Sequence, residues 1–221
     1  MEAARRREQP WPIRVAHWLS VVAVVAMAGS GLQIWIAFPY AGPRGALFAW
    51  FPFQGFKPPD FVRIGGWLGG GRHVHFLFAW LLVGVGVSYV AYVIATGEWR
   101  RRLFSPKRDT GHALDTALGY ARLAPHPPRI GLYNGLQRAA YTVALALAAI
   151  EVLSGLAIWK PEQLSWLPPL FGGFDGARAA HFLGLFGLFA FAIGHLVMVA
   201  MNPRTIVTMI TGGERTSHDD P

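Results

Sequence analysis

The sequence predicts an all-α membrane protein, a bundle of four transmembrane helices with both termini in the cytoplasm. Composition is the first reason: only 14% of the 221 residues are charged and 53% are hydrophobic, whereas about a quarter of an average soluble domain is charged. Length is the second, because four apolar stretches reach the roughly 20 residues that cross the hydrocarbon core of a bilayer. The third is the distribution of Lys and Arg, which sets orientation.

The four spans are expected at residues 13–37, 74–95, 139–158 and 179–201, within a single membrane domain over residues 1–221. The first span follows a basic segment, as in a signal peptide, but its apolar run is longer than that of a signal peptide, so we expect it to be retained. Tryptophans at the ends of the spans fit the membrane interfaces; they are Trp11, Trp18, Trp35, Trp99 and Trp159.

Orientation follows from the Lys and Arg residues of the connections. Fourteen lie in residues 1–16, between the second and third spans, or after the fourth, against six in the other two connections. The richer side is cytoplasmic, so the second and fourth spans run inward. The outer connections are residues 39–72 and 160–176, and the first contains an aromatic stretch, residues 47–56, that is too short to span.

Several functional classes are excluded by what the sequence contains. The net charge is +8, but apolar spans separate the basic groups, which argues against nucleic-acid binding. The chain has no Cys, so it holds neither a thiolate-bound iron–sulfur cluster nor a covalent c-type haem. No connection carries a nucleotide-binding or hydrolase motif. Any redox centre must therefore be held by His or Met.

Two internal repeats relate the spans. The segment 14–35 recurs 124 residues later as 138–159, with RVAH and SGLQIW matched by RAAY and SGLAIW. The segment 72–77, RHVHFL, recurs 106 residues later as 178–183, RAAHFL. The sequence therefore predicts two related helical hairpins in one bundle. Small residues would allow close helix approach; they are Gly29, Ser30, Gly31, Ser154 and Gly155.

Four of the eight His lie in or at the spans: His17, His75, His181 and His195. His181 and His195 are fourteen residues apart, which at 100° per residue places both on one helix face, about 21 Å apart. With the orientation above, His75 and His181 lie near the outer surface, and His17 and His195 near the inner one. For each of them, the alternative is a neutral imidazole that bonds to a neighbouring helix.

The depth pairing favours haem over a compact metal site. Two imidazoles at one depth can bind both axial positions of a haem iron, whereas zinc needs three or four ligands in one place. We therefore expect two bis-His b-type haems. Arg14, Arg72 and Arg178 each precede a candidate ligand by three residues, on the same helix face, where they could bind haem propionates. Alternatively, they anchor the helix ends at the interface.

Other candidates have simpler explanations. His73 faces away from His75 and is the alternative ligand there; His112, His126 and His218 are expected at the surface. Arg138 precedes Tyr141 by three residues, as Arg14 precedes His17, but Tyr141 is not a candidate ligand. Glu151 lies in the middle of the third span, where a carboxyl group is costly, and either relays quinol protons or bridges helices. Met27, Met198 and Met201 are expected to pack.

Several motifs together resemble a known family. They are His17-Trp18, the stretches RHVHFLFAW at 72–80 and YNGLQ at 133–137, Ser154-Gly-Leu, and the pair His181 and His195. Over residues 13–213 the chain resembles the bacterial cytochrome b561 and nickel–iron hydrogenase cytochrome b superfamily. The resemblance is closest to the membrane cytochromes that serve a separate molybdopterin oxidoreductase. It implies two b haems, quinone as an exchangeable redox partner, a periplasmic oxidoreductase subunit, and the lipid of a bacterial inner membrane.

Three functional hypotheses follow. The leading one is a dihaem cytochrome b subunit that transfers electrons between the quinone pool and a periplasmic oxidoreductase. The second is a stand-alone quinone oxidoreductase of the same fold that acts on a small redox substrate. The third is a haem-free, proton-coupled transporter or channel, which would show no visible absorption.

Overall fold

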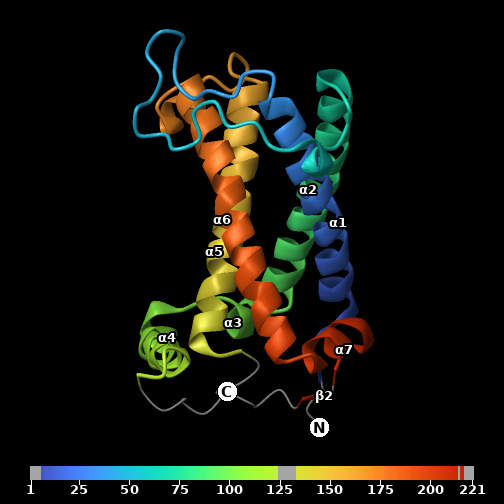
Figure 1. Ribbon diagram of the computed structural model, residues 1–221. Helices are drawn as coiled ribbons and strands as arrows, with labels where there is room; N and C mark the ends of the chain where they lie inside the picture. Colours follow the sequence, from blue (N-terminus) through green and yellow to red (C-terminus); the bar gives the residue numbers. More distant parts are fainter. Residues whose placement is uncertain (1–5, 124–132, 214, 217–221) are drawn as a thin grey trace. The chain divides into compact units, whose positions relative to one another are not determined.

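A computed structural model describes residues 6–123, 133–213 and 215–216. Its main elements are four long helices, α1 (Trp11–Trp35), α2 (Leu68–Ala95), α5 (Gly135–Trp159) and α6 (Phe174–Met201), as Figure 1 shows. All four are long and apolar enough to cross a membrane. Apolar side chains on their surfaces are exposed, as expected for helices that face lipid, among them Val22, Val25, Leu77, Val87, Ile193 and Leu196. The predicted fold class is confirmed.

All four helices begin before the predicted spans, by the largest margins at α2 and α6. α2 begins at Leu68 rather than residue 74, and α6 begins at Phe174 rather than residue 179. Hydropathy marks only the apolar stretch, whereas the backbone continues its helical hydrogen bonds through polar first turns. As a result, Arg72 and Arg178 both lie within helices.

The remaining elements are short. They are α3 (Trp99–Arg102), α4 (Pro106–Tyr120) and α7 (Arg204–Thr211), the 3-10 helices η1 (Asp60–Val62) and η2 (Pro168–Phe171), and the two-residue strands β1 (Arg6–Arg7) and β2 (Arg215–Thr216).

The chain divides into two compact units. The central unit comprises His17–Gly86 and Leu147–Phe189, and the terminal unit comprises the described residues of Met1–Ala16, Val87–Ala146 and Ala190–Pro221. Each long helix contributes one part to each unit. A single membrane domain over residues 1–221 stays a prediction.

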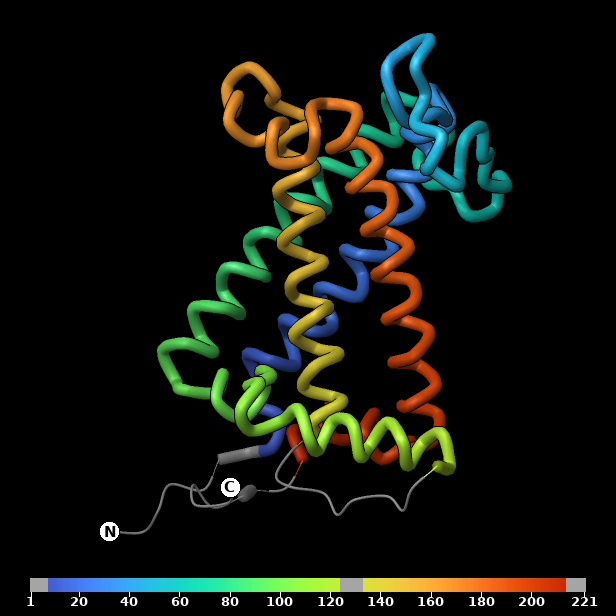
Figure 2. The backbone as a smooth tube through the Cα atoms, turned by 90° about the vertical axis from the view of Figure 1, so that its left-hand side faces the viewer, coloured from blue at the N-terminus to red at the C-terminus, as the bar shows by residue number. Residues whose placement is uncertain are grey.

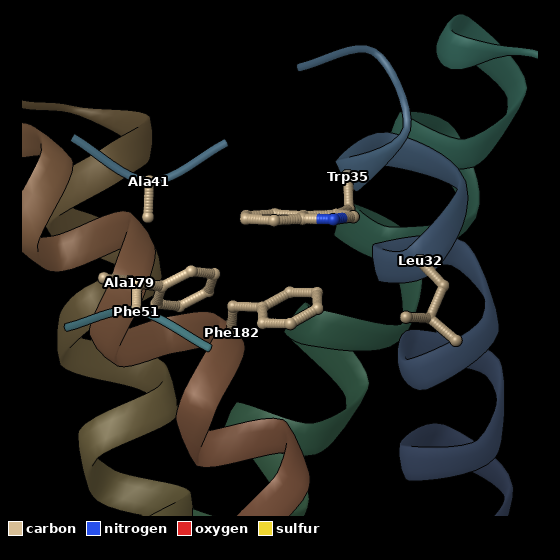
Figure 3. Packing of buried hydrophobic residues seen from close by; sticks show 6 residues of the cluster. All are labelled: Leu32, Trp35, Ala41, Phe51, Ala179 and Phe182. Atoms are coloured by element: carbon tan, nitrogen blue, oxygen red, sulfur yellow. The ribbon is translucent and has the colours of Figure 1, made fainter. Parts of the chain in front are cut away.

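The central unit has an aromatic core between its first loop and two helices. Trp35 at the end of α1 stacks on Phe182 of α6, with ring centres 3.9 Å apart (Figure 3). The indole N–H of Trp35 donates to the carbonyl of Phe56 at 3.0 Å. Phe51 of the same loop is buried against both rings. These contacts hold the loop after α1 against the first part of α6, which carries His181.

The terminal unit contains a buried polar network. The guanidinium of Arg102 donates to the Glu98 carboxylate at 2.9 Å, to the Gln9 side chain at 3.1 Å and to the Tyr133 hydroxyl at 3.1 Å. Arg102 and Glu98 are both almost fully buried. α4 lies across the first turns of α5 (Figure 2), where Arg138 of α5 pairs with Asp109 of α4 at 2.9 Å.

The two ends of the chain meet in the terminal unit. β1 pairs with β2 in antiparallel fashion, and the Gln9 N–H donates to the Gly212 carbonyl at 3.0 Å. This pairing agrees with termini on one side of the membrane, as an even number of spans requires. That this side is cytoplasmic stays a prediction.

Candidate functional site

The imidazole of His75 is held by residues of α1. Its Nδ1 atom lies 3.1 Å from the carbonyl oxygen of Met27 and 3.2 Å from the hydroxyl of Ser30. A carbonyl oxygen only accepts, so Nδ1 must carry the hydrogen. The Ser30 hydroxyl donates to the Ala26 carbonyl at 2.7 Å, which leaves its oxygen free to accept from the ring. This tautomer leaves the lone pair of His75 on Nε2.

The imidazole of His181 is held in the same way by residues of α5. Its Nδ1 atom lies 3.0 Å from the hydroxyl of Ser154, which donates its own hydrogen to the Ile150 carbonyl at 2.6 Å. The second acceptor at Nδ1 is the Glu151 carboxylate, also at 3.0 Å. His181 therefore also donates through Nδ1 and presents the Nε2 lone pair.

Two glycines make room for these rings. A Cβ atom on Gly31 would lie 3.3 Å from Cε1 of His75, and one on Gly155 would lie 3.2 Å from Cε1 of His181. Such spacings are tighter than ordinary side-chain contacts, so a larger residue would displace the ring. The Ser-Gly motif, predicted to allow close helix approach, instead makes room for an imidazole of the neighbouring helix.

The ring centres of the two imidazoles lie at a spacing that fits a shared metal ion. Their ring centres are 6.1 Å apart and their planes are inclined by 70°. A bond from a metal to an imidazole nitrogen is about 2 Å, and the ring centre lies about 1.1 Å behind that nitrogen, so two imidazoles on opposite sides of one ion have centres about 6 Å apart. Among the described residues no cluster of three or more His, Cys, Asp or Glu could hold a compact metal ion. The donor set at His75 and His181 therefore fits the two axial positions of a haem.

A family comparison agrees with this donor set. The sequence profile described as prokaryotic cytochrome b561 matches residues 8–212. The chain belongs to the prokaryotic cytochrome b561 family. Membership implies binding of b-type haem, and with the four apolar helices it identifies a multi-pass protein of the bacterial inner membrane.

Two relatives of this cytochrome b561 are named as subunits of oxidoreductases. A putative protein-methionine-sulfoxide reductase subunit, YedZ1 of Azospira oryzae, is 40% identical over 92% of this chain and 94% of its own length. A probable Ni/Fe-hydrogenase B-type cytochrome subunit of Cupriavidus necator is 24% identical over 94% of this chain and 86% of its own length.

The other two candidate ligands of this cytochrome b561, His17 and His195, belong to different units. His17 belongs to the central unit, and its ring meets that of Trp18 edge-on at 5.0 Å. His195 belongs to the terminal unit, and its ring stacks on Phe191 at 5.8 Å. Each ring therefore has an aromatic neighbour within its own unit. The pairing of His17 with His195 stays a prediction.

The three candidate propionate-binding Arg residues have different surroundings. Arg72 is exposed one turn before His75. Arg178 donates to the Phe38 carbonyl at 2.8 Å, lies 3.5 Å from the Asp175 carboxylate, and covers the ring of Trp35. Arg14 donates to the Ile210 carbonyl. Contacts of Arg14 and Arg178 agree with helix anchoring, whereas Arg72 is exposed beside a ligand candidate.

Several remaining candidates have structural roles or exposed positions. Arg138 is buried in its ion pair with Asp109. This packing role explains why the repeat keeps Arg138 although Tyr141 is not a ligand candidate. His112 accepts the backbone N–H of Gly135 at 3.0 Å and so caps the start of α5. His73 is exposed. His126 and His218 lie outside the described residues.

Sequence reasoning missed the partners of the rings, the hydroxyls of Ser30 and Ser154. Their signal was present in the repeated Ser-Gly motif, but only contacts between helices show what the hydroxyls bind. The repeat spacing of 106 residues also relates His195 to Tyr89. The inner histidines, His17 and His195, therefore both have tyrosine counterparts, Tyr141 and Tyr89.

Proposed function

We propose that this chain is the dihaem b-type cytochrome subunit of an oxidoreductase and transfers electrons between the membrane quinone pool and a periplasmic partner. The observation that carries the proposal is the pair His75 and His181, whose ring centres are 6.1 Å apart and whose Nδ1 atoms are engaged by α1 and α5. Family membership supports b-type haem as the group that this pair binds.

In this proposal His75 and His181 hold the haem nearer the outer surface, and His17 and His195 hold the inner one. Bound haem supplies a one-electron donor and acceptor. The residues of the chain hold and orient the ligands: the serine hydroxyls fix the tautomer, and Gly31 and Gly155 admit the rings. Phe182, the residue after His181, is buried with Trp35 and Phe51 in one aromatic cluster. Arg14, Arg72 and Arg178 are proposed to bind the haem propionates.

The proposed partner docks on the two outer connections. Both belong to the central unit, which also carries His75 and His181. Their aromatic and aliphatic side chains are exposed and offer contact area of the kind found at protein interfaces; they include Trp50, Phe61, Trp67, Trp166 and Leu170. The names of both relatives support an oxidoreductase as the partner. A molybdopterin-dependent partner is the narrower form of the proposal.

Haem quantitation on the purified chain tests the cofactor assignment. We expect a pyridine haemochrome stoichiometry near two per chain and a reduced-minus-oxidised spectrum that responds to a quinol. A stoichiometry near zero would leave the haem-free transporter. A value near one would eliminate one of the two pairs.

Crosslinking in native membranes tests the partner. A photoreactive residue at exposed Trp50 should capture an oxidoreductase subunit, and molybdenum analysis of the captured protein tests the narrower form. The matched control carries the probe at Leu114 of α4, which is equally exposed. Capture from Leu114 alone would place the partner in the cytoplasm, and capture from neither site would favour the stand-alone oxidoreductase.

A further inference from the structure

The two outer imidazoles differ in one acceptor. The repeat spacing of 124 residues makes Met27 and Glu151 equivalent positions, as it does Ser30 and Ser154. His75 donates to a serine hydroxyl and to the backbone carbonyl of Met27. His181 donates to a serine hydroxyl, and its Nδ1 atom lies 3.0 Å from the side-chain carboxylate of Glu151. Therefore only one of the two candidate ligands, His181, has a carboxylate beside Nδ1, whereas His75 has a neutral carbonyl there.

The fold leaves room for the Glu151 side chain beside His181. The side chain of Glu151 is only 13% exposed, on a helix that spans the membrane. Gly184, one turn after His181 on α6, would collide with the Glu151 carboxylate if it carried a Cβ atom. The absence of a side chain there leaves room for the carboxylate beside His181.

The second oxygen of the Glu151 carboxylate forms no hydrogen bond with the described residues. This atom, Oε1, is buried. A buried carboxyl group in a membrane helix is costly. Because α5 and α6 are already joined by the bond between Ser154 and His181, a second bridge at the same nitrogen is not needed to hold the helices together.

We propose that Glu151 is a positioning residue for His181, through which it lowers the reduction potential of the outer haem. One ring nitrogen of a metal-binding His binds the metal, and the other carries the N–H. A carboxylate that accepts this N–H fixes the ring orientation and raises the basicity of the ligand. A more basic axial ligand stabilises ferric over ferrous iron, and hydrogen bonding to an axial ligand is a recognised means of setting haem potential. This inference rests on the proposed ligation of a haem by His75 and His181.

The test is redox titration with electron paramagnetic resonance on purified, haem-loaded Glu151→Gln and Glu151→Met variants. Glu151→Met gives the second hairpin the residue of the first. We expect two haems per chain as in the wild type, a more positive potential for the outer haem, a changed low-spin signal for it, and an unchanged inner haem. Glu151→Asp should restore part of the shift. Leu153→Met, at an exposed position of the same helix, is the control and should leave both potentials unchanged.

The outcomes separate this inference from the proposed function. An outer-haem potential equal to the wild-type value in Glu151→Gln or Glu151→Met would overturn the role of Glu151 while the dihaem assignment stands. Loss of the outer haem from Glu151→Gln with retention in Glu151→Asp would support the carboxylate. Loss of the outer haem from both Glu151→Gln and Glu151→Asp would show that Glu151 serves helix packing, and would overturn the inference. A wild-type chain without haem would refute the proposed function itself.

Discussion

The hairpins α1–α2 and α5–α6 are alike around the outer histidines and different at the inner positions. Ser30, Gly31 and His75 in the first correspond to Ser154, Gly155 and His181 in the second, with nearly the same distances. At the inner position, by contrast, His17 of the first hairpin corresponds to Tyr141 of the second. In the proposed function each hairpin supplies one ligand to each haem. The outer pair uses equivalent positions of the two hairpins, whereas the inner pair does not.

Tyr141 shows what occupies the position where the second hairpin lacks His. Its ring meets Tyr133 edge-on at 5.1 Å and Phe191 at 6.4 Å. Phe191 in turn stacks on His195. The position has become part of an aromatic packing cluster beside an inner ligand candidate. In the proposed function the repeat thus keeps His at both equivalent positions for the outer haem, whereas the inner haem takes its two ligands from positions that are not equivalent.

Removal of single ligands should have the largest effect on this comparison. His75→Ala and His181→Ala should each abolish the outer haem, and His17→Ala and His195→Ala the inner one, because each change removes one of the two proposed iron ligands of that haem. Each variant should lose about half of the bound haem in a pyridine haemochrome assay, with loss of one component in a redox titration. Loss of the same component from His17→Ala and His75→Ala would contradict the pairing by depth.

The second prediction concerns Arg138, the repeat counterpart of Arg14. Arg138 forms a buried ion pair with Asp109, whereas Arg14 donates to a carbonyl. Breaking a buried pair costs about 3–5 kcal/mol, so Asp109→Asn should lower the unfolding temperature of the haem-loaded chain in detergent. Asp115→Asn, which removes an exposed carboxylate from the same helix as Asp109, is the control and should change it much less. Equal losses would show that the buried ion pair with Arg138 does not stabilise the fold.

The same ion pair should make stability depend on pH. Arg108, which donates to the carboxylate, holds the pKa of Asp109 well below its usual range; the Ser105 N–H and Arg138 act in the same direction, and burial opposes them. Because the folded-state pKa lies below the unfolded value of about 3.9, this contribution is complete above that value and is lost as the pH falls below it. Asp109→Asn should therefore lose less stability than the wild type on acidification.

The smallest effect is expected at the two glycines. Overpacking costs about 1–3 kcal/mol, so Gly31→Leu and Gly155→Leu should lower occupancy of the outer haem without removing the inner one. The two losses should be similar, since the Cβ spacings are 3.3 and 3.2 Å. Gly86→Leu on α2 is the control, because a Cβ there meets nothing within 4 Å. A loss from Gly86→Leu of the same size would mean that helix packing, rather than ring space, limits haem binding.

Hydropathy alone determined the fold class and the four spans, because a chain that crosses hydrocarbon must bury every backbone polar group in helices of about 20 apolar residues. It placed the starts of α2 and α6 too late, since polar first turns at the interface carry no apolar signal. The repeats singled out His75 and His181 as equivalent residues before any contact between them was visible.

Only the tertiary structure decided what surrounds those two residues. Ser30 and His75 are 45 residues apart in sequence, and Ser154 and His181 are 27 apart. Their contacts depend on the rotation and depth of two neighbouring helices, which a periodic apolar pattern does not specify. For the same reason the sequence did not decide whether Glu151 relays protons or bridges helices. Its bond to Nδ1 of His181 exists only because α5 and α6 pack with that face of each helix toward the other.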